Sequence, residues 1–147
     1  MKLLIPVDGS DLSLLAVEHA LALVRQGLRA EVVLANVQEP ASLYEMVTLH
    51  DAEALAKVAN DAGMDMLAPA VRRLTEAAVP FVQQVVTGDP AGMLLEVLEE
   101  HACDGIVLSS RGHGVLRAGW LGSVSQELVE RAPVPVTVVK PVEPETD

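Results

Sequence analysis

Residues 3–10 read LLIPVDGS, an apolar run of strand length that ends in a short polar turn. Apolar residues then recur at spacings of three and four over residues 11–26, which predicts an amphipathic helix ending near Gly27. The opening run is continuously apolar, as is typical of a strand that is buried on both faces. These residues therefore predict a strand, a tight turn and a helix that packs back onto a sheet.

The same alternation continues to the end of the chain. Four further apolar runs of strand length lie at residues 32–37, 81–86, 105–108 and 134–139. Helical patterns separate them, at residues 51–78, 90–101 and 123–131. With right-handed crossovers, this order predicts an α/β fold, a three-layer, open, doubly wound, five-stranded parallel sheet of the Rossmann-like or flavodoxin-like kind.

Local signals set the expected helix boundaries. We expect Gly63 and Pro69 to interrupt the long helix, because a proline removes a backbone hydrogen bond, and we expect an irregular loop at residues 40–50 before it. Asp89 followed by proline predicts an N-cap and a first helical residue. The serines and glutamine of residues 123–126 have the form of a capping box.

Composition limits the class of protein. The chain has 147 residues, half of them apolar, one cysteine and a formal net charge of −11. We expect one domain over residues 1–141 and an unstructured acidic tail over 142–147. The negative charge argues against a nucleic-acid or membrane-surface partner. Neither a signal peptide nor an apolar stretch of spanning length is found, which predicts a cytoplasmic protein.

The richest candidate for a site is the loop over residues 109–123. It has four glycines, three serines and two arginines but no acidic residue, and it leads into the last predicted helix. Glycines let backbone N–H groups approach a ligand, and a helix N-terminus favours an anion, so a phosphate chain suits this loop. The alternative is a loop that only turns the chain, with Ser123 acting as a helix cap. No Walker A motif or dinucleotide fingerprint is present.

Three stretches, at residues 5–10, 88–90 and 133–139, carry a resemblance to a known family. The chain is similar to the universal stress proteins of the UspA type, over nearly its whole length. The ATP-binding branch has a glycine, two residues, a second glycine, nine residues, and then Gly-Ser or Gly-Thr. Gly112 and Gly122-Ser123 stand at that spacing, whereas Ser109 occupies the first glycine position.

The resemblance implies a set of site residues. Asp8 and Val37 would meet the adenine and ribose, although Asp8 could equally cap a helix that begins near residues 10–11. The walls of that pocket would be formed by Pro6, Val7 and Leu108. The phosphate site would be formed by Gly112, Gly122, Ser123, Val124 and Ser125.

The expected function is a small ATP-binding regulatory protein of the stress response. The loop offers no clear catalytic base, so we expect no catalytic residues and at most slow ATP hydrolysis. Any Mg²⁺ would be held by the phosphates and water rather than by a metal site of the chain. An electron-transfer flavoprotein is disfavoured, because the turn at residues 8–10 is too short to wrap a phosphate.

The alternative function is a universal stress protein that does not bind ATP and works as a homodimeric protein-interaction module, with protein partners unknown. In both cases we expect a homodimer through the last strand, at Val134, Val136 and Val138, because an apolar last strand is an exposed edge unless it is paired. The competing interpretation is an edge that prolines protect from pairing.

Overall fold

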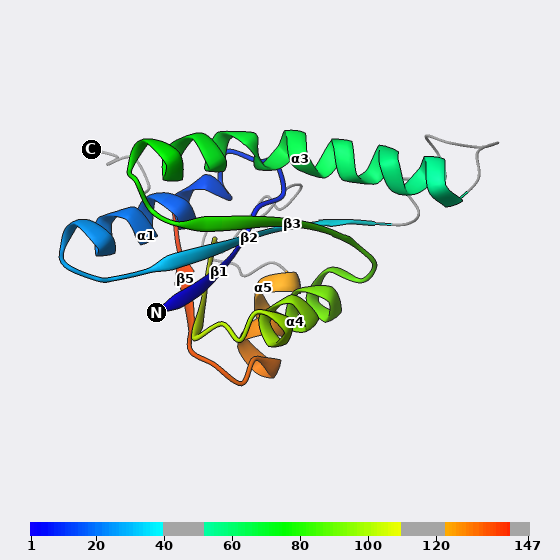
Figure 1. Ribbon diagram of the computed structural model, residues 1–147. Coiled ribbons are helices and arrows are strands. Elements are labelled where there is room, and N and C mark those ends of the chain that lie inside the picture. Colours follow the sequence, from blue (N-terminus) through cyan, green and yellow to red (C-terminus); the bar gives the residue numbers. More distant parts are fainter. Residues whose placement is uncertain (40–51, 110–122, 142–147) are drawn as a thin grey trace, which may run out of the picture.

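The computed structural model describes residues 1–39, 52–109 and 123–141 (Figure 1). The strands are β1 (Lys2–Pro6), β2 (Glu31–Gln38), β3 (Phe81–Thr87), β4 (Gly105–Ser109) and β5 (Val136–Val139). The helices are α1 (Leu14–Arg25), α3 (Ala52–Glu76), α4 (Pro90–Glu100) and α5 (Ser123–Arg131). Strands and helices alternate along the chain, as the sequence predicts.

All five strands are parallel and lie in the order β3-β2-β1-β4-β5. This is the Rossmann-like order, so the predicted doubly wound sheet is confirmed and the flavodoxin-like order is excluded. Helices α1 and α3 cover one face of the sheet, and α4 and α5 cover the other (Figure 1). None of the described helices is both long enough and apolar enough to cross a bilayer.

Each face of the sheet has its own aliphatic core. Ile5 and Leu34 lie beneath α1 and α3, whereas Leu4 lies beneath α4 and α5, and all three are fully buried. Adjacent residues of β1 thus enter opposite cores, which is why its sequence is continuously apolar. The edge strand β3 is less covered, and Val82 remains 49% exposed.

The long helix differs from the expectation. It is unbroken from Ala52 to Glu76, with Pro69 inside it, so the predicted interruption is wrong. Fully buried Leu67 and Leu74 anchor the helix to the sheet on both sides of the proline, and this packing outweighs the lost backbone hydrogen bond. Gly63 does not end the helix but lets α3 pack closely on β3, because a Cβ there would lie 2.5 Å from Val85 Cγ1.

Two other boundaries are corrected. The first helix begins at Leu14 rather than residue 11, after a turn that local hydrogen bonds hold. The last strand begins at Val136, two residues later than predicted. Pro135 has no N–H to donate, and its carbonyl accepts from the Ile106 N–H at the start of the pairing with β4.

The start of α4 agrees with its sequence signal. The Asp89 carboxylate accepts from the Gly92 N–H at 3.0 Å, and Pro90 follows at the first helical position. Helix α5 also has its predicted bounds. The irregular loop at 40–50 and the tail at 142–147 lie outside the described residues.

Candidate functional site

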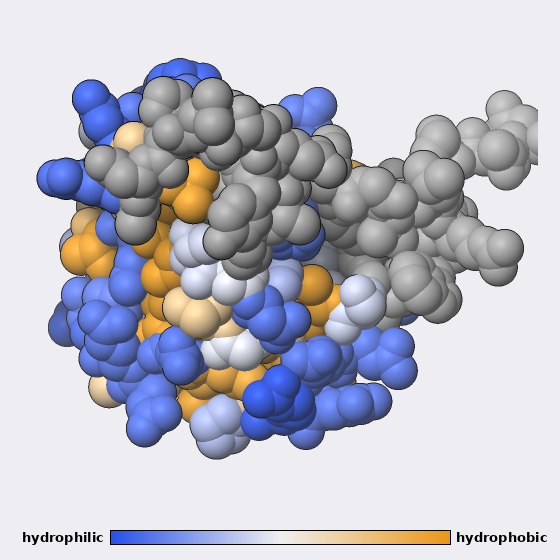
Figure 2. Space-filling view, turned by 90° about the vertical axis from the view of Figure 1, so that its right-hand side faces the viewer, coloured by the Kyte–Doolittle hydropathy of each residue, from blue (hydrophilic) through white to orange (hydrophobic). Residues whose placement is uncertain are grey.

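The strand order places a candidate site at the carboxyl edge of the sheet. From β1 the sheet extends through β2 and β3 in one direction and through β4 and β5 in the other, and ligands of such sheets bind at the carboxyl ends of strands flanking this reversal. Figure 2 views the molecule from the side toward which β2 points in Figure 1. Apolar residues reach that surface in separate patches among hydrophilic ones.

Asp8 organises the turn that follows β1. Its Oδ1 accepts hydrogen bonds from the Ser10 N–H at 2.9 Å and from Ser10 Oγ at 2.5 Å. The Ser13 hydroxyl then donates a hydrogen bond to the Ser10 carbonyl at 2.8 Å. The suggestion that Asp8 caps a helix starting near residue 10 is therefore wrong, because its carboxylate closes a turn four residues before α1 begins at Leu14.

Ser109 links three segments at the end of β4. Its Oγ donates to the Leu12 carbonyl of the turn after β1, and its own carbonyl accepts from Ser125 Oγ of α5 at 3.1 Å. Apart from glycines, only Ala78 and Ala102 have a positive φ in the described residues, so Ser109 keeps ordinary strand geometry. The serine at the family's glycine position is thus a buried connection between the turn and the helix.

Val37 extends beyond the end of β1. The ladder between the two strands closes with the Val7 N–H donating to the Ala35 carbonyl. Backbone groups of a strand alternate in direction, so the N–H and carbonyl of Val37 face the same side as those of Ala35, past the last pair. Neither group has a hydrogen bond to the described part of the chain.

A buried polar cluster beside this edge was not predicted from the sequence. Asn36 Nδ2 donates to the Val7 carbonyl at 2.9 Å, and Gln38 Nε2 donates to Asn36 Oδ1 at 2.6 Å. Both amides also approach the sulfur of Met66 on α3. The signal in the sequence is the pair of amide residues two positions apart in an apolar strand, a spacing that places both on one face.

The remaining predicted residues occupy different environments. Val7 is 2% exposed and Leu108 is 4% exposed, so their side chains belong mainly to the core. Pro6 is the half-buried last residue of β1. At the start of α5, Ser123 is exposed, Val124 half-buried and Ser125 buried. Gly112 and Gly122 lie outside the described residues.

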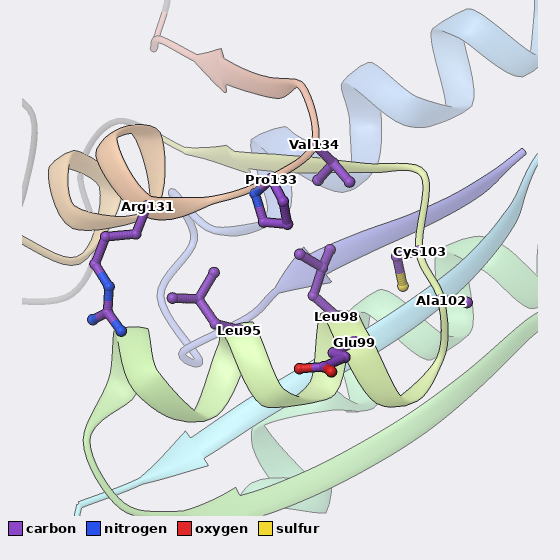
Figure 3. Close-up of a pocket in the computed structure, with 8 residues that line it drawn as sticks. All are labelled: Leu95, Leu98, Glu99, Ala102, Cys103, Arg131, Pro133 and Val134. Carbon is purple, nitrogen blue, oxygen red and sulfur yellow. The ribbon is translucent and has the colours of Figure 1, made fainter.

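The structure also has a cavity of about 510 Å³ between α4, α5 and the segment before β5 (Figure 3). Leu95, Leu98 and Cys103 are among its lining residues, together with Val134. Since Cys103 precedes β4 and Val134 precedes β5, the cavity lies toward the amino ends of the strands, opposite the candidate site. It therefore does not bear on that site.

Cys103 is a free, buried cysteine. Burial raises the pKa of its thiol above the ordinary value, while the Lys2 charge lowers it in part. The thiolate is the reactive form, so this residue is a weak nucleophile at neutral pH. Among the described residues, no group of three or more His, Cys, Asp or Glu side chains is arranged to hold a metal ion.

The sheet order defines a Rossmann-like α/β domain, and the carboxyl end of its first strand lies at the reversal in strand order where such sheets bind ligands. The Usp model of the universal stress protein family matches residues 1–140. The chain belongs to the universal stress protein family.

Curated relatives agree with this assignment. Universal stress protein MJ0531 of Methanocaldococcus jannaschii is 30% identical over 95% of this chain and 81% of its own length. Universal stress protein YxiE of Bacillus subtilis is 29% identical over 95% and 98%, respectively. A universal stress protein of Methanothermobacter thermautotrophicus is 31% identical over 96% of each chain.

Solved structures share the fold. The hypothetical protein MJ0577 superposes with a TM-score of 0.80 at 24% identity, over 97% of each chain. A universal stress protein in complex with cAMP gives 0.66 at 23% identity, over 95% of this chain and 96% of that one. A family member from Arabidopsis thaliana with AMP bound gives 0.65 at 22%, over 95% and 91%. At these identities, the superpositions establish the architecture.

Proposed function

We propose that this protein binds an adenine nucleotide, ATP, at the carboxyl edge of β1, β2 and β4, and acts as a nucleotide-binding regulatory protein of the stress response. The observation that carries the proposal is the backbone of Val37, whose N–H and carbonyl project past the end of β1. The AMP and cAMP held by two proteins of the same fold support an adenine ligand.

Val37 matches the hydrogen-bonding edge of adenine. The 6-amino group of adenine donates a hydrogen bond, and the ring nitrogen N1 beside it accepts one. A backbone carbonyl and N–H on the same side of a strand offer the complementary pair. In this proposal Val37 reads the base, Asp8 meets the ribose from the adjoining turn, and Pro6, Val7 and Leu108 border the same pocket.

The phosphates would lie at the start of α5. The first turn of this helix has no acidic residue, and its N-terminal N–H groups favour an anion. Ser125 Oγ already donates to the Ser109 carbonyl, so the backbone N–H of Ser125 is the group it would offer to a phosphate. Ser123 and Val124 would act beside it, with Gly112 and Gly122 as the sequence motif implies.

The same proposal assigns no catalytic residues. Phosphoryl transfer needs a group that positions the attacking water, and the carboxylate next to the end of β1, that of Asp8, holds its own turn. We infer at most slow hydrolysis, with Mg²⁺ bound through the phosphates. We also propose a cytoplasmic homodimer through β5, and a single domain over residues 1–141 followed by an acidic tail at 142–147.

Calorimetric titration with Mg-ATP and with AMP tests the nucleotide site. Both ligands should release or absorb heat and raise the thermal unfolding temperature, because a ligand that binds the folded state stabilises it by mass action. Mg-ATP should bind more tightly than AMP if the start of α5 holds the outer phosphates. Millimolar nucleotide that changes neither heat nor unfolding temperature would refute the proposal and favour the interaction module.

A further inference from the structure

Two methionines of α3 are equally exposed but differ in their surroundings. Met64 and Met66 each expose 37% of their surface. Met66 contacts the end of β2 and the turn after β1, whereas Met64 makes no hydrogen bond within the described residues. The pair allows oxidation of a structural methionine to be compared with oxidation of an ordinary surface methionine on the same helix.

The Met66 sulfur completes the buried amide cluster. It accepts from Asn36 Nδ2 at 3.4 Å and from Gln38 Nε2 at 3.6 Å. Asn36 is 1% exposed and Gln38 is 8% exposed. The same two nitrogens also donate to the Val7 carbonyl and to Asn36 Oδ1. The thioether therefore serves as acceptor for the second N–H of each buried amide.

The Met66 side chain also packs on Gly9. A Cβ at Gly9 would lie 3.0 Å from Met66 Cγ and 3.5 Å from the sulfur, so a side chain there would require Met66 to shift. Gly9 also has a φ of +86°, which glycine adopts without strain. Met66 is thus held between the Asp8 turn and the end of β2.

We propose that Met66 is an oxidation site, at which peroxide converts the thioether to a sulfoxide and loosens α3 from the turn over residues 7–10. In the reaction, a sulfur lone pair attacks a peroxide oxygen. The O–O bond breaks as the S–O bond forms, and sulfur loses two electrons. The departing hydroxide takes the proton of the transferred oxygen and leaves as water. The sulfoxide is larger and more polar than the thioether and is reversible by methionine sulfoxide reductases.

The added oxygen does not fit the present arrangement. On the amide side it would enter the space between the sulfur and two nitrogens already at hydrogen-bond distance. Met66 also packs on Gly9, so a shift of its side chain changes the contact between α3 and the turn. The side chain must therefore move, which separates α3 from the turn that carries Asp8. If the proposed nucleotide site is correct, oxidation of Met66 should weaken nucleotide binding.

Peroxide treatment of the wild type and of the Met64→Leu and Met66→Leu variants tests this proposal. Mass spectrometry gives the sulfoxide content at each methionine, and hydrogen exchange reports on residues 7–12 and 36–38. Oxidised wild type and oxidised Met64→Leu should exchange at least several-fold faster in both segments, and reductase treatment should restore them. Met66→Leu should show no such change. Resistance of Met66 to oxidation, or equal acceleration in Met66→Leu, would overturn the proposal.

A second variant and a second readout separate this proposal from the nucleotide site. Met66→Gln places a polar group at the same position and should show the fast exchange without peroxide. AMP affinity, measured before and after oxidation, should fall several-fold in wild type and in Met64→Leu. Absence of AMP binding before oxidation would count against the proposed function and leave the exchange test intact. Binding that oxidation leaves unchanged would overturn the coupling to the site.

Discussion

Ser109 shows how one side chain can have a different role from the one its position in a motif suggests. The family motif has a glycine there, and a side chain could have crowded a ligand. In the structure its hydroxyl donates to the Leu12 carbonyl, and its carbonyl accepts a hydrogen bond from Ser125 Oγ. The residue connects the turn that holds Asp8 to the helix proposed to hold phosphates.

Replacing Ser109 should weaken this connection. Ser109→Ala removes the donor to the Leu12 carbonyl, and we expect a loss of about 1 kcal/mol in the free energy of unfolding, the usual value for a buried hydrogen bond. Ser109→Gly should cost more, because glycine adds backbone freedom in a strand. Urea unfolding measures both variants. Unchanged stability in Ser109→Ala would show that the hydrogen bond to Leu12 does not stabilise the fold. Tighter ATP binding by Ser109→Gly would show that the serine side chain obstructs the site.

The sequence predicts the positions of individual site residues better than their roles. Asp8 could be placed after the first strand, but its choice between helix cap and ligand contact could not be decided, and it proved to close a turn through Ser10. The significance of Val37 was suggested by family resemblance alone. Its projecting backbone depends on β1 ending before β2 does, a relation between two strands that neither strand's residues encode.

At the scale of elements, α3 is where local propensity and packing disagree. Gly63 and Pro69 are poor helix residues, yet the helix is continuous from Ala52 to Glu76. Leu67, Ala70 and Leu74 are completely buried against the sheet. The strands could be predicted because a continuous apolar run indicates a buried strand. The continuity of α3, in contrast, depends on contacts with strands that are distant in sequence.

Gly63→Ala tests whether close packing requires this glycine. In an exposed helix the change would stabilise by about 1 kcal/mol, because alanine is the better helix former. Here the new Cβ would lie 2.5 Å from Val85 Cγ1 and 2.9 Å from Asn36 Oδ1. We therefore expect destabilisation of about 1–3 kcal/mol, typical of an overfilled core, in thermal or urea unfolding.

Val85→Ala provides the matched background for that experiment. It removes the two methyl groups nearest to the new Cβ, at 2.5 and 2.6 Å. Gly63→Ala should therefore cost less in Val85→Ala than in the wild type, which a double-mutant cycle measures directly. If the two changes are additive, the explanation by contact with Val85 is wrong.

The boundaries of β5 illustrate a further limit of sequence patterns. Val134 was grouped with the last strand because the apolar run is continuous, but it precedes the strand and packs against the α4–α5 core. Pro135 lies between Val134 and the first paired residue of the strand, Val136. Val134 lines the cavity on that side of the sheet and is therefore not part of the β5 edge proposed for the dimer.

At the scale of the whole molecule, β5 is an edge of the sheet, and β4 is its one partner among the described strands. The Ile106 N–H donates to the Pro135 carbonyl, so residues 135, 137 and 139 direct their backbone groups toward β4. Val136 and Val138 direct theirs outward. These two residues are the ones that another copy of the strand could pair with.

Val138→Pro should therefore convert the proposed dimer to a monomer. It removes an outward N–H while leaving the inward ladder in place, a position at which edge strands tolerate proline. Light scattering after size-exclusion chromatography should give the monomer mass, with the unfolding temperature of the monomer unit largely retained. Thr137→Pro is the control, since it removes an inward N–H and should instead destabilise the fold. If the Val138→Pro variant keeps the mass of the wild type, and that mass exceeds the mass of one chain, the interface between the two copies lies elsewhere.

In the proposed site, the carboxyl edge of the sheet binds adenine through the backbone of Val37. Calorimetric titration with Mg-ATP and Mg-ITP tests it most directly, because the hypoxanthine of ITP presents an acceptor and a donor where adenine presents a donor and an acceptor. The phosphates, ribose and metal ion are identical in the two ligands. We predict at least tenfold tighter binding of ATP, equivalent to about 1.4 kcal/mol. Equal affinity for the two nucleotides, or no binding of either, would contradict the account.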